Sequence, residues 1–301
     1  MKRPPASSVS HSHSRSQPES TKPRILVVAG SDSGGGAGIQ ADIKVITMLG
    51  GFAMTAVTAL TAQNTLGVEE VLPVEARFVA LQMRSVLTDI GADAIKTGML
   101  GSARVVEAVA NTCESLAFGV PLIVDPVMVA KGGARLLEQS ARDALVLRLL
   151  PLASLVTPNV PEAEVLAGMT IKTTRDLERA ADAILALGPS AVLLKGGHLE
   201  GDTVVDLLRT ADGAEHRFEG PRIITRSTHG TGCTLASGIA AGIAEGLTLE
   251  GAVARARAYV VQAIRLAPGL GKGHGPLEFA HPLLPNAAAT TSAPGSPNEL
   301  H

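Results

Sequence analysis

The chain has 301 residues, enough for one large α/β domain or two small ones. Hydrophobic residues make up 46% of it but aromatic residues only 2%, so aliphatic side chains must build the core and few rings are present to stack on nucleic-acid bases. The 26 basic and 28 acidic residues leave a formal charge of −2, which excludes a broad phosphate-binding surface for nucleic acid.

The termini and the cysteines indicate a cytoplasmic protein. Residues 1–23 are polar, rich in Ser, His and Pro, and contain no apolar segment of a secretory signal. We predict that they form a disordered tail, and that residues 285–301 form another. No apolar run approaches the ~20 residues that a membrane-spanning helix needs. Cys113 and Cys233 make no disulfide framework, which suits a reducing compartment. We therefore expect a single domain over residues 24–284, with neither a nucleic-acid nor a membrane partner.

Short apolar runs alternate with helical patterns along this domain. The run Ile25–Gly30 is apolar throughout, as are strands covered on both faces. Amphipathic helix patterns follow near Ile39–Leu49 and Ala76–Thr88. The next predicted strands, most of them separated by helix patterns, are Met54–Leu60, Asp93–Met99, Leu122–Met128, Ser154–Asn159 and Ala191–Gly196.

The last part of the domain has a different pattern. The runs Thr203–Leu208 and Glu215–Gly220 are separated only by a short region with an Asp-Gly turn, so they are predicted to form an antiparallel pair. Two helices are predicted to begin near Gly232 and Leu249. The repeated alternation of strand and helix predicts an α/β fold with three α/β/α layers and a mostly parallel central sheet.

Reactive or glycine-rich residues follow several of the predicted strands. In such a sheet, ligands bind beyond the carboxyl ends of the strands. The residues expected at this edge are Gly30-Ser31-Asp32, Lys96-Thr97-Gly98, Asp125, Thr157-Pro158-Asn159 and Lys195-Gly196-Gly197. Any one of them is compatible with ordinary loop chemistry. Their convergence on one edge predicts an enzyme.

A first glycine cluster, Gly34 to Gly38, lies between a predicted strand and a predicted helix. Glycines there permit a ligand to approach bare backbone N–H groups. The cluster contains no G-x-G-x-x-G spacing, and the pair Gly271-Lys272 is followed by Gly rather than Ser or Thr. A nicotinamide enzyme and a Walker P-loop are therefore disfavoured. A tight strand-to-helix turn is the alternative to a binding loop, although Asp32 and Asp42 add polar groups beside it.

A second glycine segment, Thr228–Thr234, leads into a helix with unusually small side chains. The bare amides of Gly230 to Cys233 are expected to point along the positive end of the helix dipole. Amides placed in this way stabilise the oxygens of a transferring phosphoryl group. The same field is expected to lower the pKa of the Cys233 thiol and to make the thiolate accessible. A buried, inert cysteine is the alternative, but the flanking glycines favour function.

Hard oxygen ligands and a lysine follow three other strands. Asn159 and Glu162 supply an amide and a carboxylate that can hold a hydrated Mg²⁺ against a nucleotide, and Asp125 can supply a second carboxylate. The segment of Asn159 and Glu162 is equally compatible with an ordinary helix cap. Lys195 is a mobile positive charge suited to phosphate. Burying a charged lysine without a partner costs free energy, so we expect solvent or an anion to contact its ammonium group.

Together these motifs resemble the hydroxymethylpyrimidine/phosphomethylpyrimidine kinases of thiamine biosynthesis, within the ribokinase-like superfamily. The resemblance covers the chain from about Arg24 to Pro276. It rests on AGSDSGGGAGIQAD (Ala29–Asp42), TALTAQNT (Thr58–Thr65), KTGML (Lys96–Leu100), VDPVM (Val124–Met128), TPNVPEAE (Thr157–Glu164), KGGH (Lys195–His198) and THGTGCT (Thr228–Thr234). The resemblance implies a ribokinase-like fold, ATP and Mg²⁺ as cofactors, two successive phosphorylations of a small pyrimidine alcohol, and a homodimer.

The resemblance also implies a set of substrate-binding residues. Gln63 would hydrogen-bond the aminopyrimidine edge of the substrate, because a carboxamide offers an adjacent acceptor and donor. Gly30, Met99 and Val127 would line the same pocket. Asp32 would position substrate or nucleotide. At position 34 the chain has Gly where some relatives have Ser, which affects only a minor contact.

The same resemblance implies the catalytic and nucleotide-binding residues. Cys233 would stand where most ribokinase relatives place an aspartate base, and the preceding amides would form the anion hole. The expected catalytic residues are Cys233, Lys195, Gly230 and Gly232. The expected nucleotide-binding residues are Asn159, Lys195, Thr228 and Gly230, and the expected metal ligands are Asp125 and Glu162.

Two other functions fit the same scaffold. A pyridoxal/pyridoxine kinase is one, and some of these enzymes also have Cys in the anion-hole loop. Gln63 disfavours it, because pyridine substrates lack the aminopyrimidine edge. A non-catalytic pyrimidine-binding regulator is the other. Glu162, Lys195 and Cys233 disfavour that function, since a sensor has no use for phosphoryl-transfer groups.

Overall fold

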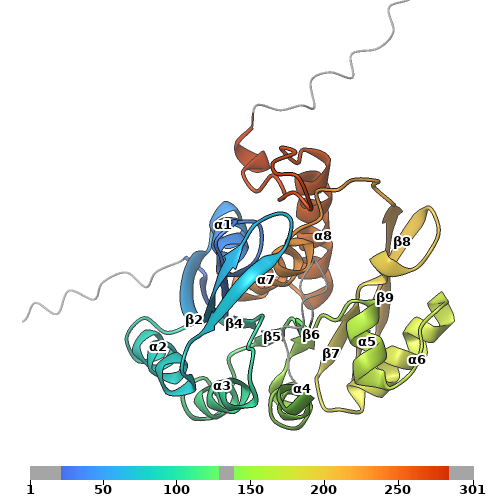
Figure 1. The fold of residues 1–301 in the computed structure, drawn as a ribbon. Coiled ribbons are helices and arrows are strands. Elements are labelled where there is room, and N and C mark those ends of the chain that lie inside the picture. The colour runs from blue at the N-terminus through green and yellow to red at the C-terminus, as the bar shows by residue number, and fades with distance from the viewer. Residues whose placement is uncertain (1–21, 129–138, 285–301) are drawn as a thin grey trace, which may run out of the picture.

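The computed structural model describes residues 22–128 and 139–284. Within these ranges nine strands form one sheet in the order β3-β2-β1-β4-β5-β6-β7-β8-β9 (Figure 1). The strands are β1 Arg24–Asp32, β2 Phe52–Gln63, β3 Val68–Pro73, β4 Ala94–Thr97, β5 Leu122–Val124, β6 Leu155–Val156, β7 Ala191–Leu194, β8 Thr203–Thr210 and β9 Glu215–Pro221. The six strands β1, β2 and β4 to β7 are parallel, whereas β3, β8 and β9 pair antiparallel. The predicted α/β fold with a mostly parallel sheet is confirmed.

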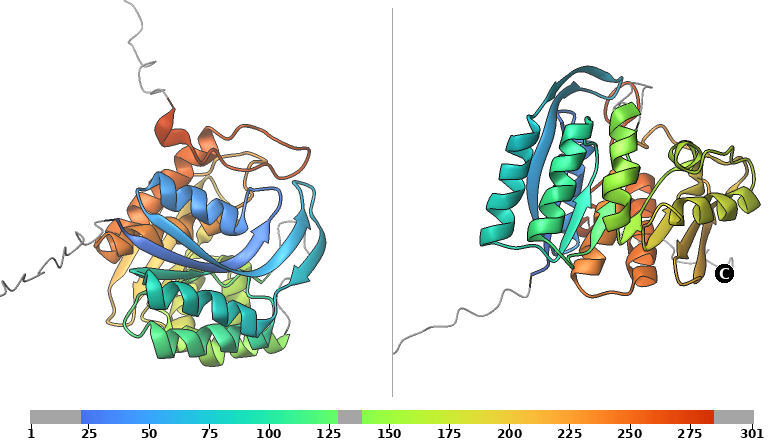
Figure 2. Two further views of the ribbon diagram at one scale, coloured as in Figure 1. Left: turned by 90° about the vertical axis from the view of Figure 1, so that its left-hand side faces the viewer. Right: turned by 90° about the horizontal axis from the view of Figure 1, so that it is seen from below.

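Helices cover both faces of this sheet, as Figures 1 and 2 show from different sides. One face carries α1 Gly38–Met48, α7 Thr231–Ala244 and α8 Leu249–Arg265. The other carries α2 Ala76–Asp89, α3 Ala103–Leu116, α4 Gln139–Ala144, α5 Val160–Ala167 and α6 Thr174–Leu185. Short helical turns are Leu145–Leu149, Leu150–Leu152, Gly196–His198 and His281–Leu283. The predicted three layers are therefore present.

The central strands are buried on both faces. Along β1, Leu26 and Val28 belong to the core beneath α2 to α6, while Ile25, Val27 and Ala29 belong to the core beneath α1, α7 and α8. None of these five side chains is more than 1% exposed. A strand in this position needs apolar residues at successive positions, which is why its sequence shows no polar alternation.

The small residues of α7 allow α8 to approach it closely. A Cβ placed on Gly238 would lie 3.0 Å from the Cβ of Ala256, and one on Gly242 would lie 2.8 Å from the Cβ of Ala252. Larger side chains would force the two helices apart. The small face that the sequence shows after the second glycine segment is therefore a helix-packing surface.

Three elements differ clearly from the prediction, and one of them is the predicted strand Leu122–Met128, which ends at Val124 as β5. Strand β3 was not predicted; from Glu69 to Pro73 every residue is exposed, so no buried face marks it in the sequence. The predicted strand Ser154–Asn159 is reduced to β6, because Pro158 has no N–H for a ladder and Asn159 already caps α5. The predicted antiparallel pair is confirmed as β8 and β9.

The predicted tails, residues 1–23 and 285–301, lie outside the described residues apart from Lys22 and Pro23. One sheet runs from Arg24 to Pro221, and this supports our proposal that residues 24–284 form a single domain. None of the helices between residues 22 and 128 or 139 and 284 combines the length and apolar character of a membrane span.

Candidate active site

The two glycine segments are in contact with each other at the carboxyl edge of the sheet. Gly230 has a φ of +84°, in the left-handed region that favours glycine. A Cβ there would lie 1.8 Å from the carbonyl oxygen of Gly36, and a Cβ on Gly36 would lie 2.6 Å from Cδ2 of His229. Each segment needs glycine because the other occupies the space of its side chain. The tight turn and the helix start therefore form one structure.

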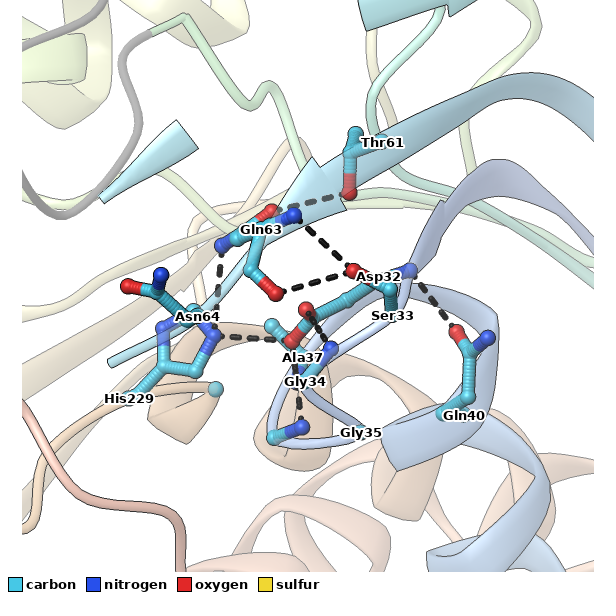
Figure 3. Close-up of polar contacts among 12 residues, drawn as sticks. Asp32, Ser33, Gly34, Gly35, Ala37, Gln40, Thr61, Gln63, Asn64 and His229 are labelled. Carbon is cyan, nitrogen blue, oxygen red and sulfur yellow. Dashed lines mark hydrogen bonds and ion pairs between the residues drawn. The ribbon is translucent and has the colours of Figure 1, made fainter. Parts of the chain in front are cut away.

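Asp32, the last residue of β1, holds the turn together (Figure 3). Its carboxylate accepts hydrogen bonds from the amides of Gly34 at 2.8 Å, Gly36 at 3.0 Å and Ala37 at 2.8 Å, and its Oδ2 lies 2.8 Å from Nε2 of His229. Burial raises the pKa of Asp32, but the bonds from His229 and the amides lower it by more, so the pKa lies below its ordinary value. With both oxygens occupied, this carboxylate shapes the site, and its geometry does not favour the expected direct contact with a ligand.

Gln63 ends β2 and lies against this turn (Figure 3). The Ser33 hydroxyl donates to its carbonyl oxygen at 2.8 Å, and its own amide donates to the Ser33 Oγ at 2.9 Å. Its side-chain Nε2 lies 3.4 Å from Nε2 of His229. The residue expected to bind substrate is thus placed between the first glycine turn and the start of α7. His229 belongs to the motif THGTGCT, but sequence reasoning assigned it no role.

The other expected pocket residues lie at the same edge, on neighbouring strands. A Cβ on Gly30 would lie 2.5 Å from Cε of Met99, so these two residues are in contact. The Thr58 hydroxyl donates to the carbonyl oxygen of Met99 at 2.6 Å and fixes that segment. Val127 follows β5, which pairs with β4, and its amide donates to the carbonyl oxygen of Asp125 at 2.8 Å.

The start of α7 faces the charged residues of the site. Within the described part of the chain, no side chain caps this helix at Gly230. A Cβ on Gly232 would lie 3.2 Å from Nζ of Lys195 and 3.7 Å from Oδ2 of Asp125. The carbonyl of Thr228 accepts a hydrogen bond from the Thr231 hydroxyl at 3.2 Å, which closes the loop before the helix. The expected anion hole and the expected phosphate-binding lysine are therefore neighbours.

Lys195, Asp125 and Glu162 form a charged cluster in which the two carboxylates are buried and Lys195 is partly buried. The Lys195 Nζ lies 3.0 Å from Oδ1 of Asp125, which also accepts from the Thr157 hydroxyl at 3.3 Å. Burial lowers the pKa of Lys195, but the two carboxylates raise it by more, so the ammonium stays charged. Burial raises the pKa of Glu162 to about 7, with Lys195 opposing the shift and Asp125 adding to it. The partner that a buried lysine requires is thus Asp125.

Asn159 and Glu162 form an ordinary helix cap, which was one of the two interpretations compatible with the sequence. The Glu162 amide donates to Oδ1 of Asn159 at 2.9 Å, and the Asn159 amide donates to Oε2 of Glu162 at 2.8 Å. The Glu162 carboxylate nevertheless lies within reach of the charge on Asp125. Residues 22–128 and 139–284 contain no group of three or more metal-ligating His, Cys, Asp or Glu. Binding of Mg²⁺ by Asp125 and Glu162, shared with nucleotide phosphates and water, stays a prediction that two neighbouring carboxylates permit.

The thiol of Cys233 is not activated in the way that its place in the sequence predicts. Burial raises its pKa to about 11, although the positive charge of Lys96 opposes the shift. The expectation of a lowered pKa is wrong, because desolvation of the thiolate outweighs the effect of the helix start.

Lys96 also differs from its expected place at the ligand-binding edge. Its side chain is completely buried, and its Nζ lies 3.0 Å from both carboxylate oxygens of Asp42. Ser237 of α7 donates to the same carboxylate at 2.6 Å. Burial lowers the pKa of Lys96, but the nearby negative groups, Asp42 first among them, together raise it by more, so the ammonium stays charged. The pair joins β4, α1 and α7 beneath the site.

Comparison of the sequence with known protein families agrees with this geometry. Residues 32–278 match the family model of phosphomethylpyrimidine kinase. The chain belongs to this family. The matched region contains every residue discussed above for the site except Gly30.

Individual relatives support the same assignment. A hydroxymethylpyrimidine/phosphomethylpyrimidine kinase of Streptomyces coelicolor is 51% identical over 263 residues, which are 87% of this chain and 96% of the relative. A thiamine biosynthesis bifunctional protein of Geobacter sulfurreducens is 52% identical over 254 residues, 84% of this chain; the chain spans only 51% of that longer protein. Among solved structures, pyridoxal kinase of Staphylococcus aureus in complex with ADP superposes with a TM-score of 0.80 at 33% identity, covering 86% of this chain and 94% of that one. The ribokinase-like fold and the use of ATP by a small-molecule kinase follow.

Proposed function

We propose that the chain phosphorylates 4-amino-5-hydroxymethyl-2-methylpyrimidine with ATP, and then phosphorylates the monophosphate to the diphosphate, in thiamine diphosphate biosynthesis. The observation that carries the proposal is the uncapped start of α7, which lies against Lys195 on one side and, through His229, against Gln63 on the other. A phosphate-binding end and a pyrimidine-reading carboxamide are thus held in one site. The names of relatives at about half identity support the same reaction.

The charged groups of the site are suited to phosphoryl transfer. In the first step, the alcohol oxygen bonds to the γ-phosphorus of ATP, the bond to the bridging oxygen breaks, and ADP leaves. The amides of Gly230 and Gly232 and the ammonium of Lys195 stabilise the charge on the phosphoryl oxygens. Asp125 and Glu162 would hold Mg²⁺, which supplies further positive charge to the phosphates. Asn159 and Thr228 border the same region, and we propose that they contact the nucleotide.

Cys233 distinguishes the two steps. The alcohol loses a proton in the first step, whereas the second step begins from a phosphate oxygen that is already anionic. We assign Cys233 as the catalytic residue that takes the alcohol proton. Because the pKa of its thiol is about 11, only a small fraction is ionised near neutral pH, so base catalysis by this residue must strengthen as pH rises.

The pyridoxal kinase alternative has weaker support. The solved structure named as a pyridoxal kinase is 33% identical, whereas the two relatives named above are 51% and 52% identical. Gln63 also lies where it can read an amino group and a ring nitrogen side by side, which a pyridine ring does not offer. A non-catalytic regulator is disfavoured by the two buried carboxylates, Asp125 and Glu162, beside Lys195, since burial of such charges is costly without a chemical use.

We further propose a cytoplasmic homodimer. The edge strand β3 pairs Leu72 with Leu60 of β2, and these side chains are 62% and 49% exposed. A second copy of the chain covering this pair would remove exposed apolar surface. Measurement of mass in solution by light scattering, for the natural chain and for Leu60→Ser/Leu72→Ser, tests the proposal. A natural chain that is monomeric at working concentrations would contradict it.

Gln63→Leu tests the substrate assignment. The change removes a hydrogen-bonding pair and leaves two polar substrate atoms unmatched, so we expect a loss of roughly 2–4 kcal/mol in kcat/KM for the pyrimidine alcohol. Slow hydrolysis of ATP without substrate should remain close to that of the natural chain. Gln139→Leu is the control, because Gln139 is an exposed glutamine of α4 whose Nε2 donates to Asp143 at 3.0 Å. Equal losses in both activities of Gln63→Leu would mean that Gln63 has a structural role.

A further inference from the structure

Residues from three separate parts of the chain meet at the side chain of Gln63 (Figure 3). At one end, its Nε2 lies 3.4 Å from Nε2 of His229, which in turn lies 2.8 Å from Oδ2 of Asp32. At the other end, its Oε1 lies 3.2 Å from Oγ1 of Thr61. The oxygen and nitrogen of a carboxamide have nearly the same shape, so the neighbouring donors and acceptors decide which end is which.

Asp32 determines where His229 carries a proton. The carboxylate accepts hydrogen bonds from three backbone N–H groups, and these bonds favour its ionised form although its burial opposes ionisation. An ionised carboxylate can only accept, so the His229 Nε2 beside it must be protonated, whether the ring is neutral or charged. A protonated Nε2 cannot accept a hydrogen bond from the NH₂ group of Gln63. The single Nε2 proton is directed mainly at Asp32, so an NH₂ group of Gln63 would face another donor at this end, whereas the carboxamide oxygen can share that proton.

Thr61 leads to the same orientation independently. Its Oγ1 lies 2.9 Å from the carbonyl oxygen of Ser31 and 3.2 Å from the Gln63 carboxamide. The hydroxyl has one proton, and the carbonyl of Ser31 can only accept, so the proton is used there. Toward Gln63 the hydroxyl offers a lone pair, which is complementary to the NH₂ group. Both ends therefore favour the reverse of the arrangement in which Nε2 faces His229: the Gln63 oxygen lies toward His229 and its nitrogen lies toward Thr61.

We infer that Asp32 and His229 are positioning residues that hold the Gln63 carboxamide in this one orientation and thereby select the order of donor and acceptor on the substrate ring. The inference rests on the proposed function and deepens it. The oxygen of Gln63 requires a donor on the His229 side, and its nitrogen requires an acceptor on the Thr61 side. A 4-aminopyrimidine presents this order through its amino group and adjacent ring nitrogen. Its 4-oxo analogue presents C=O and N–H, the reverse order, and fits only if Gln63 turns over and gives up both contacts.

The test compares kcat/KM for the 4-amino alcohol and its 4-oxo analogue. His229→Leu removes the N–H that orients Gln63, and His229→Gln keeps an N–H donor at a similar reach. We expect the natural chain to prefer the amino substrate by at least about 100-fold. His229→Leu should reduce this preference by about tenfold or more, because Gln63 is then free to turn, whereas His229→Gln should keep it within about threefold. Thermal melting verifies that each variant is folded.

Thr61 provides a second pair of variants at the other end. Thr61→Val removes the acceptor and should also reduce the preference, whereas Thr61→Ser keeps the hydroxyl and should preserve it. If His229→Leu does not fold, the two Thr61 variants test the inferred orientation of Gln63 on their own. Lower activity on both substrates with an unchanged preference in His229→Leu or in Thr61→Val would overturn the inference while leaving the proposed function intact. Failure of the natural chain to phosphorylate the amino alcohol would overturn the proposed function and the inference with it.

Discussion

Replacing Cys233 by alanine or serine, while each phosphorylation is followed separately across pH, tests the proposed proton transfer. The structure sets the expected pH range, because burial raises the pKa of this thiol to about 11. A thiol of ordinary pKa would reach its plateau roughly two pH units lower. The rise in activity should therefore continue well beyond the range in which most kinases are assayed.

The size of this rise follows from the fraction of thiolate. With a pKa of about 11, that fraction increases about tenfold for each pH unit, so kcat of the first step should increase about 100-fold from about pH 8 to about pH 10. The second step begins from an ionised phosphate and should change little over the same range. In Cys233→Ala the first step should lose this rise and fall by ~10²–10⁴-fold at the high end, the usual contribution of a general base.

Rapid quenching followed by chromatography of the monophosphate and diphosphate measures the two steps independently, each from its own purified substrate. Cys233→Ser is the matched control for shape, since a hydroxyl does not ionise in this range. Circular dichroism at each pH verifies that the fold persists. A first step that shows the same pH dependence in the natural chain and in both variants would refute the base assignment. Cys233 would then be a structural part of the helix start.

Other variants probe the cation site and the buried charges. Glu162→Gln should keep the fold, because an amide can still complete the cap, but raise the Mg²⁺ concentration needed for half-maximal activity; an unchanged requirement would place the cation at Asp125 alone. Lys96→Met leaves the Asp42 carboxylate unpaired at 0% exposure and should reduce the free energy of unfolding in urea by about 3–5 kcal/mol. Lys96→Met/Asp42→Leu should recover most of this loss, and a single-variant loss below about 1 kcal/mol would contradict the ion pair. The lowered pKa of Asp32 stabilises the fold fully above its ordinary pKa of 3.8, and this contribution is lost as pH falls through the folded value. The difference in free energy of unfolding between the natural chain and Asp32→Asn should therefore shrink below about pH 4. A difference that stays constant across this range would contradict the lowered pKa of Asp32.

Much of the fold could be predicted because its central strands are buried on both faces. The apolar run of β1 and the regular helix patterns between strands specify a parallel sheet without further information. Strand β3 was missed because its exposed residues, Glu69 and Glu70 among them, carry no periodic burial signal. Its place depends on backbone pairing with β2, which leaves no trace in side-chain composition.

The site was predictable as a set of segments but not as a set of contacts. Asp32, Asp125 and Lys195, which were predicted at one edge of the sheet, do lie at the carboxyl ends of their strands. Nothing local in the sequence indicates that His229 bonds to Asp32, or that Lys96 turns inward to Asp42. The raised pKa of Cys233 could not be read from its helix position either, because it depends on burial by the surrounding layers. Contacts between distant side chains and the desolvation of buried groups arise only in the folded chain.

The contact between the two glycine segments has a consequence for how the protein folds. The hydrogen-bonded pair at its centre joins residues 197 positions apart, so most of the chain must be synthesised and the sheet largely assembled before it can form. Contacts of such long range slow folding, since the search for them precedes any gain in energy. A nascent chain that ends before Gly230 can contain the first turn and all nine strands and still lack a binding site. We therefore expect substrate and nucleotide to act as ligands of the finished fold only, late in folding, with no role in guiding its earlier steps.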